Sequence, residues 1–203
     1  MKCIVFDLAG VVFARNKERC PESLMEFFSF INSGEPMPWF WDNYDRGTMT
    51  IDEVAAELGK MKGCNTAYTK KMMLSAIEYQ EEVEPTKALI RDLKAAGYRL
   101  IVLSNMSCEY IAYLRRKEVY GYFDGEVISC ETHTIKPEIE IYRTLLEEYA
   151  LEASETMFID DRKENVEAAA TLGIAPFNFD RDDAATSCAR LRELLLGAQS
   201  QTE

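Results

Sequence analysis

The feature that most constrains the fold is a set of five short apolar runs rich in β-forming residues. None of them alternates between apolar and polar residues, and this pattern is typical of strands buried on both faces. Helical patterns separate the later runs, and strand–helix alternation indicates βαβ units with a parallel sheet. We therefore expect an α/β fold in which helices flank a parallel sheet. The runs are Cys3–Phe6, Arg99–Leu103, Glu126–Ser129, Met157–Ile159 and Ile174–Phe179.

The helical segments that follow these runs carry start and stop residues at their ends. Proline opens two of them and glycine follows two of them, which is the usual asymmetry of helix termini. Ser107 is a candidate N-cap for one segment. The expected helices are Pro85–Ala96, Cys108–Lys117, Pro137–Tyr149, Lys163–Leu172 and a last amphipathic one, Asp182–Leu196.

Residues 14–84, here called the insert, break this rhythm, because they hold helical patterns and no convincing strand. Thr50 and Glu53 form a capping box, which marks a helix N-terminus. We expect an all-helical subdomain inserted after the first strand, so that residues 1–13 and 85–203 form the α/β core. The helical patterns are Pro21–Ile31, an aromatic patch at Trp39–Tyr44, Thr50–Lys60 and Thr66–Glu81.

The chain of 203 residues is acidic, with 23 Lys and Arg against 35 Asp and Glu and a formal net charge of −12. Such a surface repels nucleic-acid phosphates and anionic lipids, so we expect neither nucleic acid nor a membrane as a partner. No apolar run approaches the ~18 residues of a spanning helix, and the stretch that ends at Asp7 is too short for a signal peptide. We expect a cytoplasmic monomer or homodimer whose six scattered cysteines are free thiols.

Polar residues follow the apolar runs at the points where the predicted strands end. In open parallel sheets, ligands bind at the carboxyl ends of the strands, so we expect these residues to lie together. They supply three carboxylates, a hydroxyl, an amide and an ammonium. The residues are Asp7, Ser104 with Asn105, Lys136 from the loop after the third run, and Asp160 with Asp161.

Three carboxylates do not share a small space without a cation. Oxygen ligands suit Mg²⁺, which completes its shell with water and substrate phosphate. Ser104 and Lys136 are then expected to face phosphate oxygens. An ionised Asp7 beside a phosphate group is a plausible covalent nucleophile.

Four segments carry a resemblance to a known family. FDLAGVV at 6–12, LSN at 103–105, KP at 136–137 and FIDDRKENVEAA at 158–169 resemble, in order and spacing, the four motifs of the haloacid dehalogenase (HAD) superfamily. The resemblance spans roughly residues 1–180 and implies a Rossmann-like core with a helical cap after the first strand. KPEIEIY and DDRKENVEAA resemble the branch that contains α-glucose-1-phosphate phosphatase. It implies a Mg²⁺-dependent phosphatase of a small phosphorylated metabolite, such as a sugar phosphate.

The resemblance also implies a role for each matching residue. Asp7 matches the nucleophile that forms an aspartyl-phosphate, and Ser104, Asn105 and Lys136 match the phosphate-binding positions. The metal ligands implied are the carboxylates of Asp7, Asp160 and Asp161 and the backbone carbonyl of Ala9.

Position 9 departs from the family pattern. Most phosphatases of the family have a second Asp two residues after the nucleophile, where it protonates the leaving oxygen and then activates water, and this chain has Ala9. Loss of a general acid–base typically costs ~10²–10⁴ in rate. Four readings stay open: a slow enzyme, one that favours good leaving groups such as anomeric sugar phosphates, one that uses another acid, or a binding protein.

Four residues near these motifs are further candidates for substrate contact, each with a structural alternative. His133 is the only histidine and lies three residues before Lys136, so it could replace the missing acid–base or be an ordinary surface residue. Trp41 could stack on a substrate or belong to the insert's own core. Arg15 and Arg46 could touch substrate or be ordinary exposed arginines.

Two functions compete with the phosphatase. A 2-haloacid dehalogenase would use the same Asp7 without a metal, but the pair Asp160 and Asp161 would then repel a carboxylate substrate. A non-catalytic protein that binds a phosphometabolite or regulates a partner is the alternative that Ala9 suggests. A phosphotransferase is disfavoured, since those relatives usually rely on the Asp that is missing here.

Overall fold

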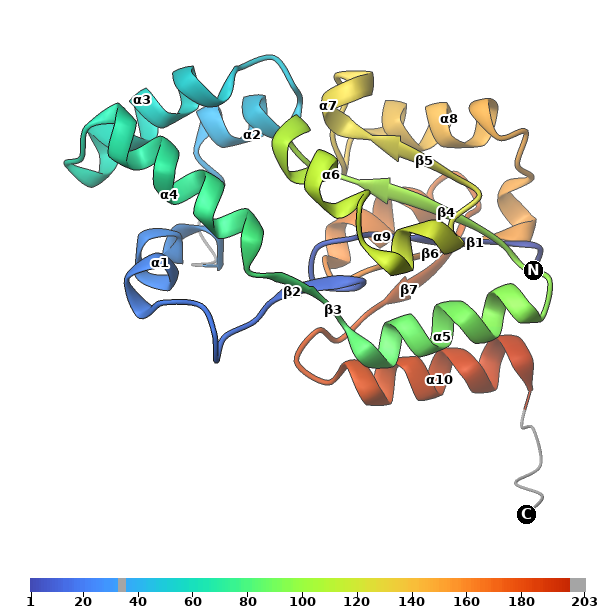
Figure 1. Cartoon of the computed structure of the whole chain (residues 1–203). Helices are drawn as coiled ribbons and strands as arrows, with labels where there is room; N and C mark the ends of the chain where they lie inside the picture. Colours follow the sequence, from blue (N-terminus) through green and yellow to red (C-terminus); the bar gives the residue numbers. More distant parts are fainter. Residues whose placement is uncertain (33–35, 198–203) are drawn as a thin grey trace.

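A five-stranded parallel sheet forms the centre of the computed structural model, which describes residues 1–32 and 36–197 (Figure 1). The strand order is β5-β4-β1-β6-β7, and every neighbouring pair is parallel. This confirms the predicted Rossmann-like α/β fold, and each expected run lies within two residues of a strand. The strands are β1 (Cys3–Phe6), β4 (Arg99–Ser104), β5 (Gly125–Ile128), β6 (Thr156–Asp160) and β7 (Ala175–Asn178).

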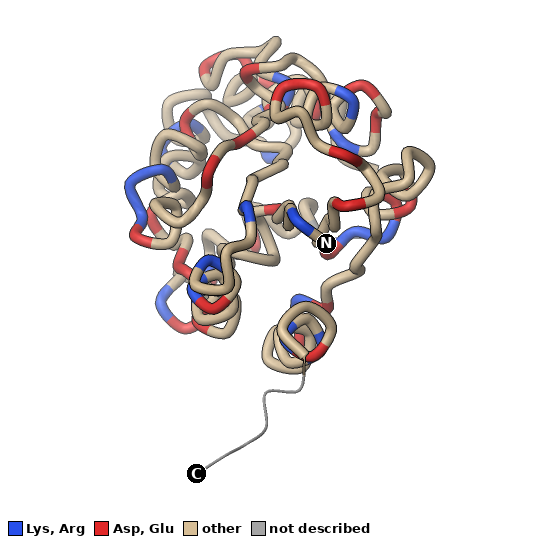
Figure 2. The backbone as a smooth tube through the Cα atoms, turned by 90° about the vertical axis from the view of Figure 1, so that its right-hand side faces the viewer, with Lys and Arg blue, Asp and Glu red and all other residues tan. Residues whose placement is uncertain are grey.

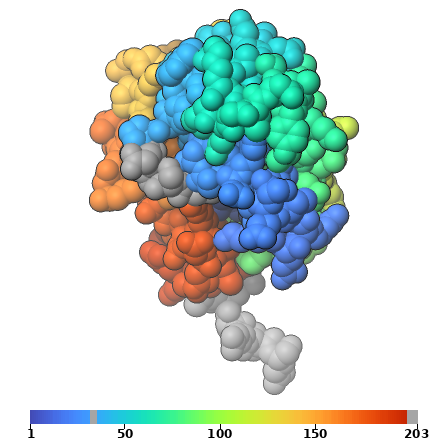
Figure 3. Space-filling view, turned by 90° about the vertical axis from the view of Figure 1, so that its left-hand side faces the viewer, coloured from blue at the N-terminus to red at the C-terminus, as the bar shows by residue number. Residues whose placement is uncertain are grey.

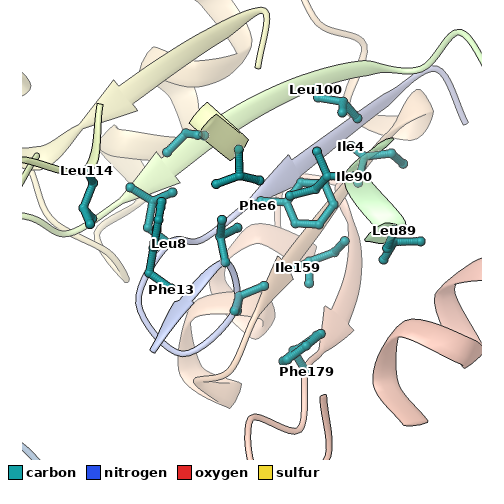
Figure 4. Close-up of a cluster of buried hydrophobic side chains, with 14 of the residues drawn as sticks. Ile4, Phe6, Leu8, Phe13, Leu89, Ile90, Leu100, Leu114, Ile159 and Phe179 are labelled. Atoms are coloured by element: carbon teal, nitrogen blue, oxygen red, sulfur yellow. The ribbon is translucent and has the colours of Figure 1, made fainter. Parts of the chain in front are cut away.

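Helices cover both faces of the sheet because successive side chains of each strand point to opposite sides. Ile4 and Phe6 of β1 pack with α5, α6 and α10 on one face (Figure 4). Cys3 and Val5 pack with α8 and α9 on the other face. The core helices are α5 (Glu84–Ala95), α6 (Cys108–Leu114), α7 (Ser129–Thr132), α8 (Ile139–Glu148), α9 (Lys163–Ala170) and α10 (Ala184–Leu196), with short 3₁₀ turns η2 (Glu118–Tyr122) and η3 (Ala153–Glu155).

The helices of the insert pack around a separate apolar cluster. Leu24, Phe28, Trp41, Leu58 and Met73 are among its buried members. In space-filling view the insert, blue to green, covers the upper part of the face shown in Figure 3, above the orange and red segments of the core. Its helices are α1 (Glu22–Phe27), η1 (Ser29–Asn32), α2 (Trp39–Asp45), α3 (Ile51–Lys62) and α4 (Thr66–Glu78).

The two ends of the insert are strands, which the sequence did not predict. β2 (Phe13–Arg15) and β3 (Gln80–Glu82) form an antiparallel ribbon in which Phe13 pairs with Glu82 and Arg15 with Gln80. The two passages of the chain between insert and core run side by side and satisfy each other's backbone groups. Such short strands have too few residues to show an apolar pattern in the sequence. The helix expected over 66–81 ends at Glu78, because the residues that follow pair with β2.

The helix termini follow the predicted caps in one case and not in another. Thr50 and Glu53 form the reciprocal capping box of α3. Ser107 precedes α6, but its side chain makes no hydrogen bond to the helix end. The helix stops at Leu114 rather than at residue 117, because the next amides turn more tightly and Lys117 N donates to the carbonyl of Leu114 at 2.9 Å.

Charged residues of both signs are interspersed along the chain (Figure 2). Arg115, for example, pairs with Glu126 and Glu131. All six cysteines are free thiols, as predicted. None of the helices in residues 1–32 and 36–197 is long and apolar enough to cross a membrane.

Candidate active site

Five of the predicted site residues meet at the carboxyl edge of the sheet. β4, β1 and β6 are neighbours, and Phe6 is level with both Val102 and Ile159, so the residues after these strands lie side by side. Lys136 joins them from the loop after α7. The residues brought together are Asp7, Ser104, Lys136, Asp160 and Asp161.

One buried ammonium group ties this cluster together. Lys136 Nζ lies 2.8 Å from Asp7 Oδ1 and 2.6 Å from Asp160 Oδ2, and it donates to the carbonyl of Leu103 at 3.1 Å. Ser104 Oγ also donates to Asp7 Oδ1, at 2.8 Å. Both contacts fall on the same oxygen of Asp7. Oδ2 of Asp7 therefore makes neither of these contacts and is available to bind a metal ion or to act as a nucleophile.

The charges of the cluster are out of balance. Burial raises the pKa of Asp7 to about 6, although Lys136 opposes the shift, and the charges of Asp160 and Asp161 add to it. Burial works to lower the pKa of Lys136, but Asp160 and Asp7 together raise it. Lys136 contacts Asp7 and Asp160, and Arg181 contacts Asp161, so two cationic side chains face three carboxylates and a further cation would lower the free energy of the ionised cluster.

The donor set fits a hard divalent ion. Asp7, Asp160 and Asp161 each offer a carboxylate oxygen, and these oxygens all lie within 4.8 Å of one another. All-oxygen donors suit Mg²⁺. Gly10 has φ +83°, and a Cβ there would lie 2.6 Å from Asp161 Oδ2. A glycine thus lets the loop that carries Ala9 close onto the cluster, and Ala9 itself is exposed.

The acidic pair is held by partners from the loop and helix that follow β6 and from the segment after β7. Asn165 Nδ2 donates to both oxygens of Asp160 at 3.0 Å, and the amide of Arg162 donates to Asp160 Oδ1 at 2.8 Å. Arg181 Nη1 lies 3.2 Å from Asp161 Oδ2. Sequence reasoning missed Arg181, because it follows β7 and belongs to none of the four motifs.

The side chain of Asn105 bonds to the backbone of the loop that carries Lys136. Its Nδ2 donates to the carbonyl of Lys136 at 2.9 Å, and its Oδ1 accepts from the amide of Lys136 at 2.7 Å. Both polar atoms of the side chain are used on the backbone of the lysine loop. Asn105 therefore positions Lys136, and its side chain is not directed at a phosphate.

Trp41 and Arg15 lie in the aromatic cluster of the insert. The ring of Trp41 packs edge-on against Phe28, Phe30 and Tyr44 with centroid distances of 6.0, 5.3 and 5.7 Å. Arg15 lies over the ring of Phe28 at 5.5 Å. Trp41 therefore belongs to the insert's own core, whereas Arg15 is half-buried against Phe28 and is not an ordinary exposed arginine.

Arg46 and His133, from the insert and the core, lie in contact with each other. Arg46 forms two hydrogen bonds to the carboxylate of Glu138, at 2.6 and 2.9 Å, and donates to the carbonyl of His133 at 3.1 Å. The Nδ1 of His133 lies 3.0 Å from the carbonyl of Arg46. This group, here called the latch (Arg46, His133 and Glu138), joins the insert to the loop that carries Lys136.

Asp45 is a site residue that sequence reasoning missed. It ends α2, is half-buried, and no motif marks it. Burial, followed by the charge of Asp42, raises the pKa of Asp45 to about 7; Asp7 acts in the same direction, while Arg162 and Lys136 oppose the shift. A carboxyl group of the insert therefore lies within electrostatic reach of the cluster.

An open cleft of about 880 Å³ lies beside Asp161. Ile31, Pro36 and Met37 line it from the insert, and Arg162 and Arg181 are among its core residues. Of the carboxylate cluster, Asp161 lines this cleft but Asp7 and Asp160 do not, so the cleft borders the site. Asp180 and Asp182 also line it, so its core wall carries charges of both signs.

The comparisons with known proteins agree with this geometry. A family model described as a haloacid dehalogenase-like hydrolase matches residues 1–173. The chain is 28% identical over 199 residues to a sesquiterpene phosphatase of Aspergillus oryzae, and the match covers 96% of this chain and 96% of that protein.

Two solved structures have the same fold. A HAD family enzyme of Bacteroides thetaiotaomicron, in complex with magnesium and inorganic phosphate, matches with a TM-score of 0.71 and 24% identity over 89% of this chain and 95% of that one. A HAD-like family hydrolase of Porphyromonas gingivalis matches with a TM-score of 0.72 and 24% identity, covering 94% and 97% of the two chains.

Proposed function

Because this chain belongs to the haloacid dehalogenase-like hydrolases, we propose that it is a Mg²⁺-dependent phosphatase of a small phosphorylated metabolite. The observation that carries the proposal is the buried Asp7 carboxylate, fixed through Oδ1 by Lys136 and Ser104 beside two further carboxylates. A phosphatase relative over nearly the whole chain supports it. So does the magnesium and phosphate complex of the Bacteroides enzyme.

In the proposed reaction Asp7 is the nucleophile. Its free oxygen attacks phosphorus in line with the leaving oxygen, and an aspartyl-phosphate forms that water then hydrolyses. Ser104 and Lys136 bind phosphate oxygens during this exchange. Asp7, Asp160, Asp161 and the carbonyl of Ala9 would hold Mg²⁺, which when bound neutralises charge on the transferring phosphoryl group.

We further propose that the insert is the cap domain of this enzyme, with residues 1–13 and 85–203 as the core domain. The apolar wall of the cleft beside Asp161 comes from the insert, so the insert would select the leaving group. The sequence motifs favour a sugar phosphate and the fungal relative a phosphorylated terpene. A substrate panel has to include both.

The test is phosphate release from sugar, terpene and simple alkyl monophosphates, with Mg²⁺ and with EDTA. We expect release that needs Mg²⁺ and that falls by ~10⁴ or more in Asp7→Asn. Asp92→Asn is the matched control, because Asp92 is a surface residue of α5 paired with Arg192 and far from the cluster in sequence and in contacts. Equal release from wild type and Asp7→Asn would refute the proposed nucleophile.

One observation favours a second candidate. Ala9 offers no acid beside Asp7, and this favours a phosphometabolite-binding protein with a hydrolase fold as the second candidate. That reading predicts saturable binding of a monophosphate with no phosphate release over hours at high protein concentration. Turnover in the panel would exclude it.

A further inference from the structure

Phosphate transfer to Asp7 leaves an alkoxide that needs a proton, and few groups near Asp7 have one to give. Lys136 donates to both Asp7 and Asp160, and the hydroxyl of Ser104 donates to Asp7. Asp161 belongs to the set of oxygens that fits a metal ion. The side chains of the cluster are therefore committed to binding and positioning.

Asp45 is not committed in this way. Within residues 1–32 and 36–197, its carboxylate makes no hydrogen bond and no ion pair. It is nevertheless half-buried at the end of α2, where the insert faces the core. A carboxyl group without a partner in such a place has lost water without gaining a bond, which is a cost that fold stability alone does not explain.

The backbone around Asp45 is fixed to the carboxyl edge of the sheet. Ser129 Oγ donates a hydrogen bond to the carbonyl of Asp45 at 2.5 Å, and the same hydroxyl oxygen accepts one from the amide of Met106 at 2.8 Å. A Cβ at Gly47 would collide with the carbonyl of Cys130, so the chain here lies directly against α7. Figure 1 shows the end of α2 beside α6 and α7, next to the end of β4.

Charges of the core reach Asp45 from two strand ends and one loop. Asp7 follows β1, Lys136 comes from the loop after α7, and Arg162 follows β6, and each of them acts on Asp45. Asp42, one turn earlier on α2, acts on it as well. Because such interactions fade over about 10 Å, the carboxyl group of Asp45 lies within electrostatic reach of the cluster.

We propose that Asp45 is the general acid and base of this site and performs from the insert the proton transfers that no side chain at position 9 can perform. The proposal rests on the phosphatase function. In this proposal the Asp45 carboxyl group contacts the leaving oxygen in the first step and the attacking water in the second. Asp45 is therefore a catalytic residue and not a residue that positions another side chain.

Each step balances. When Asp7 attacks phosphorus, the bond to the leaving oxygen breaks, and protonated Asp45 gives its proton to that oxygen to release the alcohol. The Asp45 carboxylate then takes a proton from water as the water oxygen attacks the phosphoryl group on Asp7. The bond from phosphorus to Asp7 breaks, and phosphate, free Asp7 and protonated Asp45 result.

The electrostatics suit both halves of this cycle. Burial raises the pKa of Asp45 to about 7, so the carboxyl exchanges its proton near neutral pH. A general acid–base works best when its pKa is close to the working pH. The charged groups facing it are Asp42, Arg162, Asp7 and Lys136, and Tyr110 of α6 lies within reach.

The experiment compares two leaving groups in Asp45→Asn. An alkyl phosphate from the panel releases a strongly basic alkoxide, whereas p-nitrophenyl phosphate releases a stable phenolate that needs no proton. We expect the first turnover of Asp45→Asn to be ~10²-fold or more slower with the alkyl phosphate and within about tenfold of wild type with p-nitrophenyl phosphate. The second half needs Asp45 with either substrate, so p-nitrophenol should appear as a burst followed by a slow phase.

The controls separate chemistry from folding. Asp52→Asn changes an exposed acid of α3 that pairs with Lys70, and it should leave both rates unchanged. Asp45→Glu should recover part of the alkyl phosphate rate. An equal loss with both substrates in the first turnover would mean a structural role and would overturn the proposal, as would wild-type rates in Asp45→Asn.

The experiments distinguish a failure of the role proposed for Asp45 from a failure of the phosphatase function. If Asp7→Asn is inactive while Asp45→Asn behaves as wild type, the phosphatase stands and the role of Asp45 falls. If wild type releases no phosphate from any substrate in the panel, both proposals fall.

Discussion

At the scale of single residues, one ammonium group organises the site. Lys136 holds Asp7 and Asp160 in place while its own loop is held by both side-chain atoms of Asn105. Its Nζ also lies 5.3 Å from the centre of the fully buried Phe158 ring. Removal of such a partner would leave buried carboxylates unpaired, so the geometry of the nucleophile and the stability of the sheet edge depend on the same side chain.

The raised pKa of Asp45 has a consequence for stability. Burial and the charge of Asp42 raise that pKa from 3.8 to about 7, so at intermediate pH the folded protein keeps a proton that the unfolded chain releases. Rising pH therefore lowers the free energy of unfolding through this group. We expect Asp45→Asn to stabilise the protein by on the order of 2 kcal/mol above about pH 7 and to have no effect below about pH 4.

Urea denaturation in EDTA across this pH range measures the effect. Asp92→Asn serves as the exposed control and should not change the pH dependence. A difference between Asp45→Asn and wild type that stays constant with pH would contradict the shifted titration.

The sequence predicts those site residues whose position depends on the sheet alone. Asp7, Ser104 and Asp160 each follow or end a strand, and neighbouring parallel strands bring such residues together. Asp45 could not be found in this way, because its place depends on how α2 docks on the core. That docking is made by contacts far apart in the sequence, such as the bond from Ser129 to its carbonyl.

At the scale of elements, the predicted strands of the core are confirmed because burial on both faces leaves a continuous apolar run. β2 and β3 lack this signal, since β2 has a single buried residue, Phe13, and the residues of β3 are polar and half-buried. The helix of the insert with the clearest boundary is α3, where Thr50 and Glu53 satisfy amides at the N-terminus. Local chemistry of this kind is readable from sequence, whereas pairing between distant segments is not.

The capping box gives a prediction at this scale. Thr50→Ala removes the side-chain acceptor for the amide of Glu53 and the hydroxyl that donates to the Glu53 carboxylate, so we expect a loss of about 1 kcal/mol in the free energy of unfolding. Lys71→Ala, on α4 and part of no cap, should change the free energy by less than about 0.5 kcal/mol. Urea denaturation of both variants is the measurement, and equal effects would argue against a stabilising cap.

At the scale of the whole molecule, the insert is attached to the core by the β2–β3 ribbon and by the latch. Arg46 supplies the only bidentate contact of the latch, to Glu138. Arg46→Ala should raise the opening of the insert by roughly fivefold, which corresponds to about 1 kcal/mol for a half-exposed ion pair. Hydrogen exchange in α2 and α7 should then speed up, and KM for the substrate should rise.

Lys70→Ala is the matched control, because the pair of Lys70 with Asp52 lies within the insert. It should leave exchange in α7 unchanged. Unaltered exchange in Arg46→Ala would mean that the bond of Ser129 to Asp45 and the ribbon hold the insert without the latch.

The ribbon has one more consequence. Arg15 and Gln80 face each other in register, so the chain leaves and re-enters the sheet domain at adjacent points. Paired antiparallel residues are only about 5 Å apart, so a tight turn could join these two positions without moving any strand of the sheet. The insert is in this sense an exchangeable module: gene recombination or protein engineering could replace it with another helical segment and so give the same carboxylate cluster a different choice of substrate.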